Sequence, residues 1–170
     1  MSYCIAHLKR DGGFTLAELV VVIAILGILS AYAVLKLPSP AQATLPSQAR
    51  QLASDLRHAQ ALAITWGQSL VVSASGSRYS IACRTAAATA PCDATPVVDP
   101  ATGSAFSTSL QKDVSFGSPT TASLTFDSLG RPVDSSGTPL ASDPAASYTL
   151  SAGSSTQTVT VTRLSGKVSP

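Results

Sequence analysis

The residue whose type and position most clearly point to chemistry is Glu18, the only glutamate in this chain of 170 residues. It lies shortly after Phe14 inside a long apolar segment, where an unpaired carboxylate costs roughly 3 kcal/mol. Such a side chain reaches the membrane surface, is protonated, or pairs with a cation. A cut between Gly13 and Phe14 would create a cation, the α-amine of Phe14, and opposite charges attract strongly at low dielectric. We therefore expect Glu18 of one subunit to hold the Phe14 amine of its neighbour during assembly.

The amino terminus has the order of an unusual export signal. Residues 1–13 place Lys9 and Arg10 beside a Gly12-Gly13 pair, before the apolar segment. Cleavage after these small residues would retain the apolar segment, whereas an ordinary secretory signal loses it. Residues 14–37 would form about 36 Å of helix, enough to cross a bilayer core of about 30 Å. We expect a leader at 1–13 and a transmembrane and assembly helix at 14–37, with the leader cytoplasmic and the rest of the chain outside.

Other candidates for catalysis or metal binding are few. A mature chain would keep one histidine, His58, which follows Asp55 at a helical spacing that usually gives a solvated pair. No nucleophile motif or third group completes a triad, and a zinc site would need more ligands. Asp127 and Asp134 could face a Ca²⁺, but scattered aspartates are common in turns. We expect no enzyme activity, no catalytic residues, no metal site and no cofactor.

The three cysteines separate by compartment. Cys4 lies in the expected leader, whereas Cys83 and Cys92 enclose a short loop in the exported part. Oxidising conditions there favour a disulfide between Cys83 and Cys92. The alternative is two free buried thiols.

The segment from Gly13 to Leu19, GFTLAEL with basic residues upstream, resembles the class III signal of type IV pilins and type II secretion pseudopilins. The resemblance implies that a prepilin peptidase cuts after Gly13 and methylates the amine of Phe14. It also implies that the apolar helix serves first as an inner-membrane anchor and then as the stem that packs against other pilins. The family usually has a proline at the position of Leu35, where this chain has none, and the nearby prolines predict that the helix ends or bends near Leu37.

The rest of the chain suits one small α+β domain. Overall 45% of the residues are hydrophobic and only 12% are charged, too apolar for disorder. Residues 38–67 read as a proline-containing linker and an amphipathic helix, with Thr44 as the cap, Pro46 in the first turn and Gly67 at the end. The apolar stripe that should pack on a sheet comprises Leu45, Ala49, Leu52, Leu56, Ala59, Ala63 and Trp66. The opposite face comprises Arg50, Ser54, Arg57 and Ala61.

Residues 68–170 read as a β-rich domain with a small antiparallel sheet. Gly76 between the first two runs and Ser165-Gly166 between the last two supply turns, residues 99–103 form another turn, and residues 84–109 look like a loop. The expected strands are 69–73, 77–83, 114–116, 123–126, 148–151 and 158–163. Val159 and Val161 alternate with threonines, which predicts one buried and one exposed face.

Three parts of this region resemble the GspH/FimT group of minor pilins: residues 48–72, the segment FDSLGRP at 126–132, and the closing run at 159–168. Within that group the cysteine pair, the turn at 99–103 and FDSLGRP are most similar to MshC-type minor pilins of mannose-sensitive haemagglutinin (MSHA) pili.

DNA is an alternative partner, because some FimT-like pilins bind DNA through basic residues near the carboxyl end. Here only Arg163 and Lys167 lie in that region. They would neutralise about two phosphates, too few for tight binding without a further cluster from Arg78, Arg84 or Arg131. The formal net charge of +2 is also slight, and we do not expect DNA binding.

The resemblance implies a minor pilin, anchored by a single pass in the inner membrane with its C-terminal domain periplasmic. It would then join a filament at or near the tip and prime assembly of a type IV pilus such as the MSHA pilus. Two alternatives share the same stem: a GspH-like pseudopilin of type II secretion and a FimT-like DNA-uptake pilin.

Overall fold

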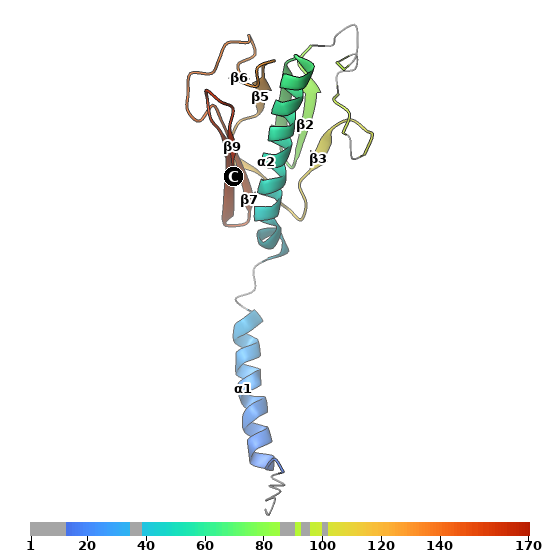
Figure 1. The fold of residues 1–170 in the computed structure, drawn as a ribbon. Helices are drawn as coiled ribbons and strands as arrows, with labels where there is room; N and C mark the ends of the chain where they lie inside the picture. Colours follow the sequence, from blue (N-terminus) through green and yellow to red (C-terminus); the bar gives the residue numbers. More distant parts are fainter. Residues whose placement is uncertain (1–12, 35–38, 86–90, 93–95, 100–101) are drawn as a thin grey trace, which may run out of the picture. The chain divides into compact units, whose positions relative to one another are not determined.

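The computed structural model describes residues 13–34, 39–85, 91–92, 96–99 and 102–170 (Figure 1). The chain divides into an N-terminal unit, Met1–Leu37, and a C-terminal unit, Pro38–Pro170. Each unit is described by itself.

The N-terminal unit contains the helix α1, Leu16–Val34. Thr15 caps it, since its hydroxyl accepts a hydrogen bond of 3.2 Å from the backbone N–H of Glu18. Residues Leu16–Ala33 have a mean hydropathy of 2.4, and none of this span is buried. By length and composition, α1 could cross a membrane. The expected end or bend near Leu37 lies outside the described residues.

The C-terminal unit begins with α2, Pro40–Trp66, which starts earlier than the sequence led us to expect. Its N-cap is Ser39, not Thr44. The Ser39 hydroxyl accepts from the Gln42 N–H, and the Gln42 side chain accepts from the Ser39 N–H, both at 3.2 Å. This capping box satisfies two donors at the helix start, so Thr44 lies inside the helix and bonds the Pro40 carbonyl instead. Pro46 is likewise interior. The predicted end is confirmed, because Gly67 is left-handed with φ 63°.

Two antiparallel sheets follow, where the sequence suggested one. The first has the order β3-β2-β1-β5-β6 and the second β4-β7-β8-β9. The first sheet comprises β1 (Leu70–Ser75), β2 (Arg78–Cys83), β3 (Ser107–Ser109), β5 (Ser123–Phe126) and β6 (Pro132–Val133). The second comprises β4 (Ser115–Thr120), β7 (Ala146–Ala152), β8 (Ser155–Val161) and β9 (Val168–Ser169). All paired strands run antiparallel, and the expected α+β class is confirmed.

The turns agree in part with the expected ones. Gly76, with φ 59°, joins β1 to β2 as predicted. The turn between β7 and β8 contains Gly153, while Ser165-Gly166 joins β8 to β9, which corrects the predicted position. Residues 84–109 are not wholly a loop, because β3 lies within them.

Helix α2 lies against both sheets and contributes the centre of the core (Figure 1). Its buried residues are Leu45, Ala49, Leu52, Ala53, Asp55, Leu56, Ala59 and Ala63. All of these except Ala53 and Asp55 recur every three or four positions, which places them on one face, and Ala53 and Asp55 flank that stripe. Val159 and Val161 of β8 are buried as their alternation predicts. The apolar stripe therefore joins two sheets that do not share a hydrogen-bonded edge.

Candidate functional site

The amino-terminal site consists of Gly13, Phe14 and Glu18, at the start of α1. Gly13 and Phe14 precede the helix, and the Phe14 side chain is 81% exposed. Glu18 is exposed in the first turn. Its side chain makes no hydrogen bond or ion pair with any described residue. The positive end of the helix dipole stabilises a carboxylate at this position. The carboxylate is also accessible to a cation from another molecule.

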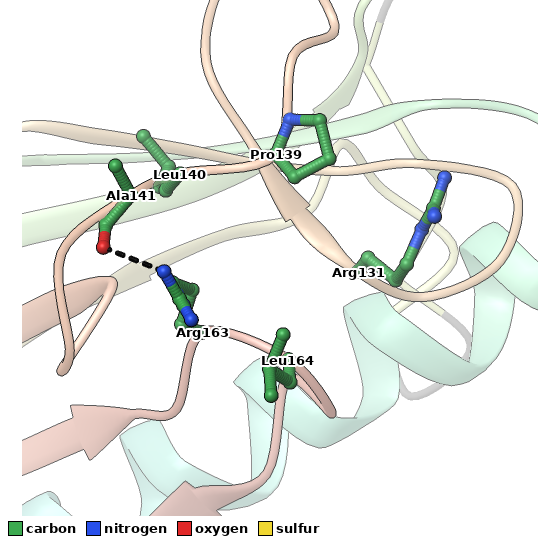
Figure 2. Close-up of a pocket in the computed structure, with 6 residues that line it drawn as sticks. All are labelled: Arg131, Pro139, Leu140, Ala141, Arg163 and Leu164. Carbon is green, nitrogen blue, oxygen red and sulfur yellow. Dashed lines mark hydrogen bonds between the residues drawn. The ribbon is translucent and has the colours of Figure 1, made fainter.

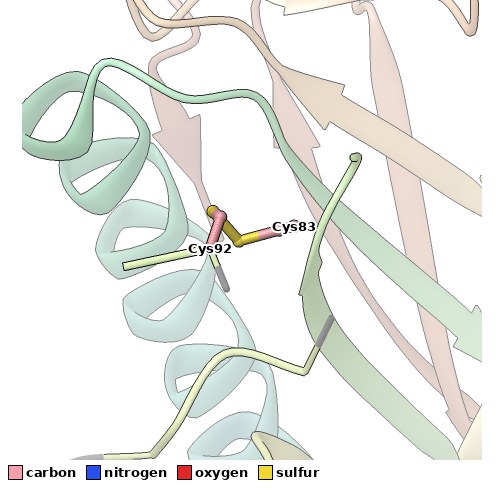
Figure 3. Close-up of a disulfide and its surroundings, with 2 residues drawn as sticks. All are labelled: Cys83 and Cys92. Atoms are coloured by element: carbon pink, nitrogen blue, oxygen red, sulfur yellow. A yellow bond between two sulfur atoms is a disulfide. The ribbon is translucent and has the colours of Figure 1, made fainter. Parts of the chain in front are cut away.

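Cys83 and Cys92 form the expected disulfide (Figure 3). Cys83 ends β2, and the two Cα atoms are 5.8 Å apart, a normal separation for a disulfide. Cys92 is fully buried against the core that α2 contributes. Beyond it, the Val97 N–H donates to the Ile81 carbonyl at 3.3 Å, and the Phe106 N–H donates to the Val97 carbonyl at 2.7 Å. The bridge thus helps hold the connection after β2 against the first sheet.

Asp55 and His58 do not form the solvated pair that their spacing suggested. Asp55 is only 8% exposed and accepts a hydrogen bond of 2.5 Å from the Tyr79 hydroxyl. Gln51 donates to both oxygens of the same carboxylate. His58 instead stacks on Phe106 with ring centroids 6.1 Å apart. The reason is tertiary: β2 brings Tyr79 against α2, and the hydrogen bonds from Tyr79 and Gln51 offset the cost of burying the Asp55 carboxylate.

The surroundings of this pair connect α2 to the first sheet. Burial, together with the hydrogen bond to Asp55, raises the pKa of Tyr79 above its ordinary value. Gln51, Asp55 and His58 line a depression of about 280 Å³. The hydrogen bond between Tyr79 of β2 and Asp55 of α2 links the helix to the first sheet.

Asp127 and Asp134 each organise a turn. Asp127 accepts from the backbone N–H groups of Leu129 and Arg131, and its carboxylate forms an ion pair of 2.8 Å with Arg131. Partial burial alone raises the pKa of Asp127, but the bonds from Arg131 and Leu129 together lower it below its ordinary value. Hydrogen bonds from the Ser136 hydroxyl and the Thr138 N–H likewise lower the pKa of Asp134. The described residues contain no group of three potential metal ligands.

The basic residues considered for DNA are only partly brought together. Arg131 and Arg163 line one pocket of about 380 Å³, together with Pro139, Leu140, Ala141 and Leu164 (Figure 2). Arg163 donates to the Ala141 carbonyl at 2.9 Å. The Arg84 guanidinium donates to the Ser135 carbonyl elsewhere, and neither Lys167 nor Arg78 lines this pocket.

Sequence reasoning missed one residue that organises this corner of the unit, Gln60 on α2. Its amide donates to the carbonyl oxygens of Gly130 and Ser165, at 2.8 Å and 2.9 Å. Its position beside the apolar stripe gave no signal of these partners, because they lie far along the chain in two separate turns.

Two family models match the chain. Residues 48–166 match the model described as type II transport protein GspH, and residues 8–34 match the prokaryotic N-terminal methylation motif. Among solved structures, the fold is similar to that of the type IV minor pilin FimU of Pseudomonas aeruginosa strain PAO1. That likeness has a TM-score of 0.50 at 14% identity and covers 78% of this chain and 91% of that one. No curated protein matches.

Proposed function

Since the chain belongs to the GspH family of type II transport proteins and carries the N-terminal methylation motif, we propose that it is a minor pilin that helps to start assembly of a type IV pilus. The finer proposal is a pilus of the MSHA type. It rests on the similarity of the cysteine pair, the turn at 99–103 and the segment at 126–132 to MshC-type pilins.

The observation that carries the proposal is the exposure of α1. A helix with every described side chain from Leu16 to Ala33 exposed and a mean hydropathy of 2.4 would not persist in water by itself, because apolar surface costs about 25 cal/mol per Å². Other molecules must cover it. A bilayer would do so first, with the C-terminal unit in the periplasm, and the helices of neighbouring subunits would do so in a filament.

The first turn of α1 supports the proposed order of events. Prepilin peptidase would cut the exposed bond between Gly13 and Phe14 and methylate the new amine of Phe14. That amine remains a cation, so a neighbour's Glu18 carboxylate can hold it. Because Glu18 has no partner among the described residues, it needs no rearrangement to do so. Pairing across subunits would set the axial register as each subunit leaves the membrane.

Variants at Glu18 test this mechanism against the simpler role of stabilising the helix start. Glu18→Ala and Glu18→Gln should both give a processed, folded chain that enters sheared filaments roughly tenfold less, as expected when a charge pair worth about 1.4 kcal/mol is lost. Glu18→Asp, which keeps the charge, should retain part of the incorporation. Quantitative immunoblots of sheared filaments and membranes measure the ratio. Glutamine can still stabilise the helix start but carries no charge. Normal incorporation of Glu18→Gln would therefore contradict the pairing.

Deletion of the gene distinguishes the machines. Loss of sheared pili with normal export of secreted enzymes supports the pilus proposal. Intact pili with enzymes trapped in the periplasm would instead assign the chain to type II secretion.

A further inference from the structure

One corner of the C-terminal unit is built from two turns that α2 holds together. The Gln60 amide bridges the turn at 127–131 to the turn at 162–166 through the carbonyls of Gly130 and Ser165. The turns touch each other, because a Cβ added at Gly166 would lie 2.6 Å from the Gly130 oxygen. A Cβ at Gly130 would lie 2.7 Å from the Ile64 side chain. The corner is therefore closely packed and defined in shape.

This corner also concentrates exposed apolar side chains. Among the described residues of the C-terminal unit, four large hydrophobic side chains are exposed: Ile64 at 53%, Val98 at 59%, Leu129 at 66% and Leu164 at 77%. Three of the four, Ile64, Leu129 and Leu164, belong to the two turns or to the part of α2 beneath them. Grouped exposed apolar residues around a pocket are typical of a protein contact surface.

The charged groups at the corner leave room for one carboxylate from another molecule. Arg131 already pairs with Asp127 at 2.8 Å. Arg163 donates to the neutral Ala141 carbonyl and has no ion pair with a described residue. Asp143 accepts from the backbone N–H of Arg163, at 3.3 Å, rather than from its guanidinium. The pocket therefore presents one guanidinium without a carboxylate partner, beside Pro139, Leu140 and Leu164 (Figure 2).

We propose that this corner, the Gln60-bridged pocket between Arg131, Arg163 and Leu164, binds a segment of a neighbouring pilin subunit that carries a carboxylate next to an apolar side chain. The carboxylate pairs with Arg163 in two parallel hydrogen bonds, the geometry that guanidinium groups favour. The apolar side chain covers Leu164 and Leu140. Nucleic acid fits less well, because a phosphate backbone needs several unpaired cations in a row.

The corner lies far from the start of α2 within the C-terminal unit. Gln60 is roughly 30 Å along the helix from Pro40. The proposal rests on the proposed pilin function and adds a second contact to it: the apolar helix supplies affinity common to all subunits, and the corner selects one partner.

Photo-crosslinking in cells tests the proposal with the full chain. Leu164→p-benzoylphenylalanine should cross-link to another pilin subunit in sheared filaments, within a few residues of an Asp or Glu that peptide mass spectrometry identifies. Ser154→p-benzoylphenylalanine is the matched control, because Ser154 is exposed in the turn between β7 and β8. This turn lies near Gln42, at the other end of α2.

Charge variants then separate contact from fold. Arg163→Glu should lower the Leu164 cross-link about tenfold or more, Arg163→Lys should lower it less, and Arg78→Glu, an equal charge change at the exposed start of β2, should leave it unchanged. Replacing the identified partner carboxylate by Lys should restore the cross-link to Arg163→Glu. Protease resistance of each variant monitors folding.

The outcomes distinguish this inference from the proposed function. A chain present in filaments without a cross-link at Leu164, or with one insensitive to Arg163→Glu, overturns the corner as a docking site. Cross-linking to DNA overturns it in favour of uptake. A chain absent from filaments and uncut at Gly13 overturns the pilin proposal, and this inference with it.

Discussion

The helices α1 and α2 use apolar residues in opposite ways. In α1 the apolar side chains surround the helix, and none from Leu16 to Ala33 is buried. In α2 they occupy one face, and Leu52, Leu56 and Ala59 have no exposed surface. Hydrophobicity alone therefore does not define a core. The arrangement around the helix decides whether a segment completes its own fold or waits for another molecule.

This difference assigns separate tasks to the two units. The C-terminal unit buries its apolar residues in its own core and can be stable by itself, whereas α1 gains stability only from what covers it. Changes to the two helices should accordingly affect different measurements.

The largest expected effect is the difference in unfolding free energy between the same Leu→Ala substitution made in α2 and in α1. Leu56→Ala removes a fully buried side chain and should lower the free energy of unfolding by about 2–5 kcal/mol. Leu26→Ala, at a side chain 55% exposed, should change it by about 0.5 kcal/mol or less. Denaturant titration of the full chain in detergent, followed through the single Trp66, measures both. Equal losses would remove the distinction between the helices.

Breaking the disulfide should have the next largest effect, again confined to the C-terminal unit. The loop between Cys83 and Cys92 spans 9 positions, and closing a loop of this length is worth about 2–3 kcal/mol. The double variant Cys83→Ala/Cys92→Ala should lose this amount while helix content in detergent stays unchanged. Alkylation without reductant should leave unchanged the mass of the chain cleaved after Gly13, which lacks Cys4, whereas two added labels would contradict the bridge.

Two buried tyrosines test the contribution of a single hydrogen bond within the C-terminal unit, with a smaller expected change in unfolding free energy. Tyr79→Phe removes the hydroxyl that donates to Asp55 and should cost about 1–3 kcal/mol, because a buried carboxylate loses a partner. Tyr148→Phe is the control, since its buried hydroxyl has no hydrogen-bond partner among the described residues. Its removal should be neutral or slightly stabilising. The same melts report both, and similar losses would show that the Asp55 contact adds nothing.

The smallest effect concerns the pH dependence of the turn at Asp127. The pKa of Asp127 is lowered in the folded chain, so its contribution is present above the ordinary carboxyl pKa of about 4 and lost as the pH falls through the folded value. Asp127→Asn should therefore cost less than about 1 kcal/mol at pH 7 and progressively less as the pH falls through the folded pKa. Melts across this range measure the difference. A constant difference would mean that the charge of Asp127 is not involved.

Much of the architecture could be predicted from periodicity and turn residues. The stripe of α2, the Gly67 end and strand β5 follow from local patterns that tertiary structure then uses unchanged. The early start of α2 was also readable, because Ser39 and Gln42 have the spacing of a capping box. Pro46 favours a later start, since prolines usually mark a first turn, but it lies inside the helix.

The remaining differences depend on contacts between distant residues. Nothing local assigns β5 and β7 to different sheets, since strand pairing depends on partners elsewhere in the chain. Burial of Asp55 depends on Tyr79, and the corner at Leu164 depends on Gln60 reaching two turns. The amino-terminal motif was predictable because its chemistry lies within a few consecutive residues.

The capping box at Ser39 has a practical consequence for producing the protein. Because Ser39 and Gln42 supply the first bonds of α2 from within the helix itself, the helix does not require α1 as a template on which to begin. A recombinant chain that starts a residue or two before Ser39 should therefore nucleate α2 normally. It would omit the apolar segment that demands detergent, and so allow crystallisation and solution binding assays of the C-terminal unit in plain buffer.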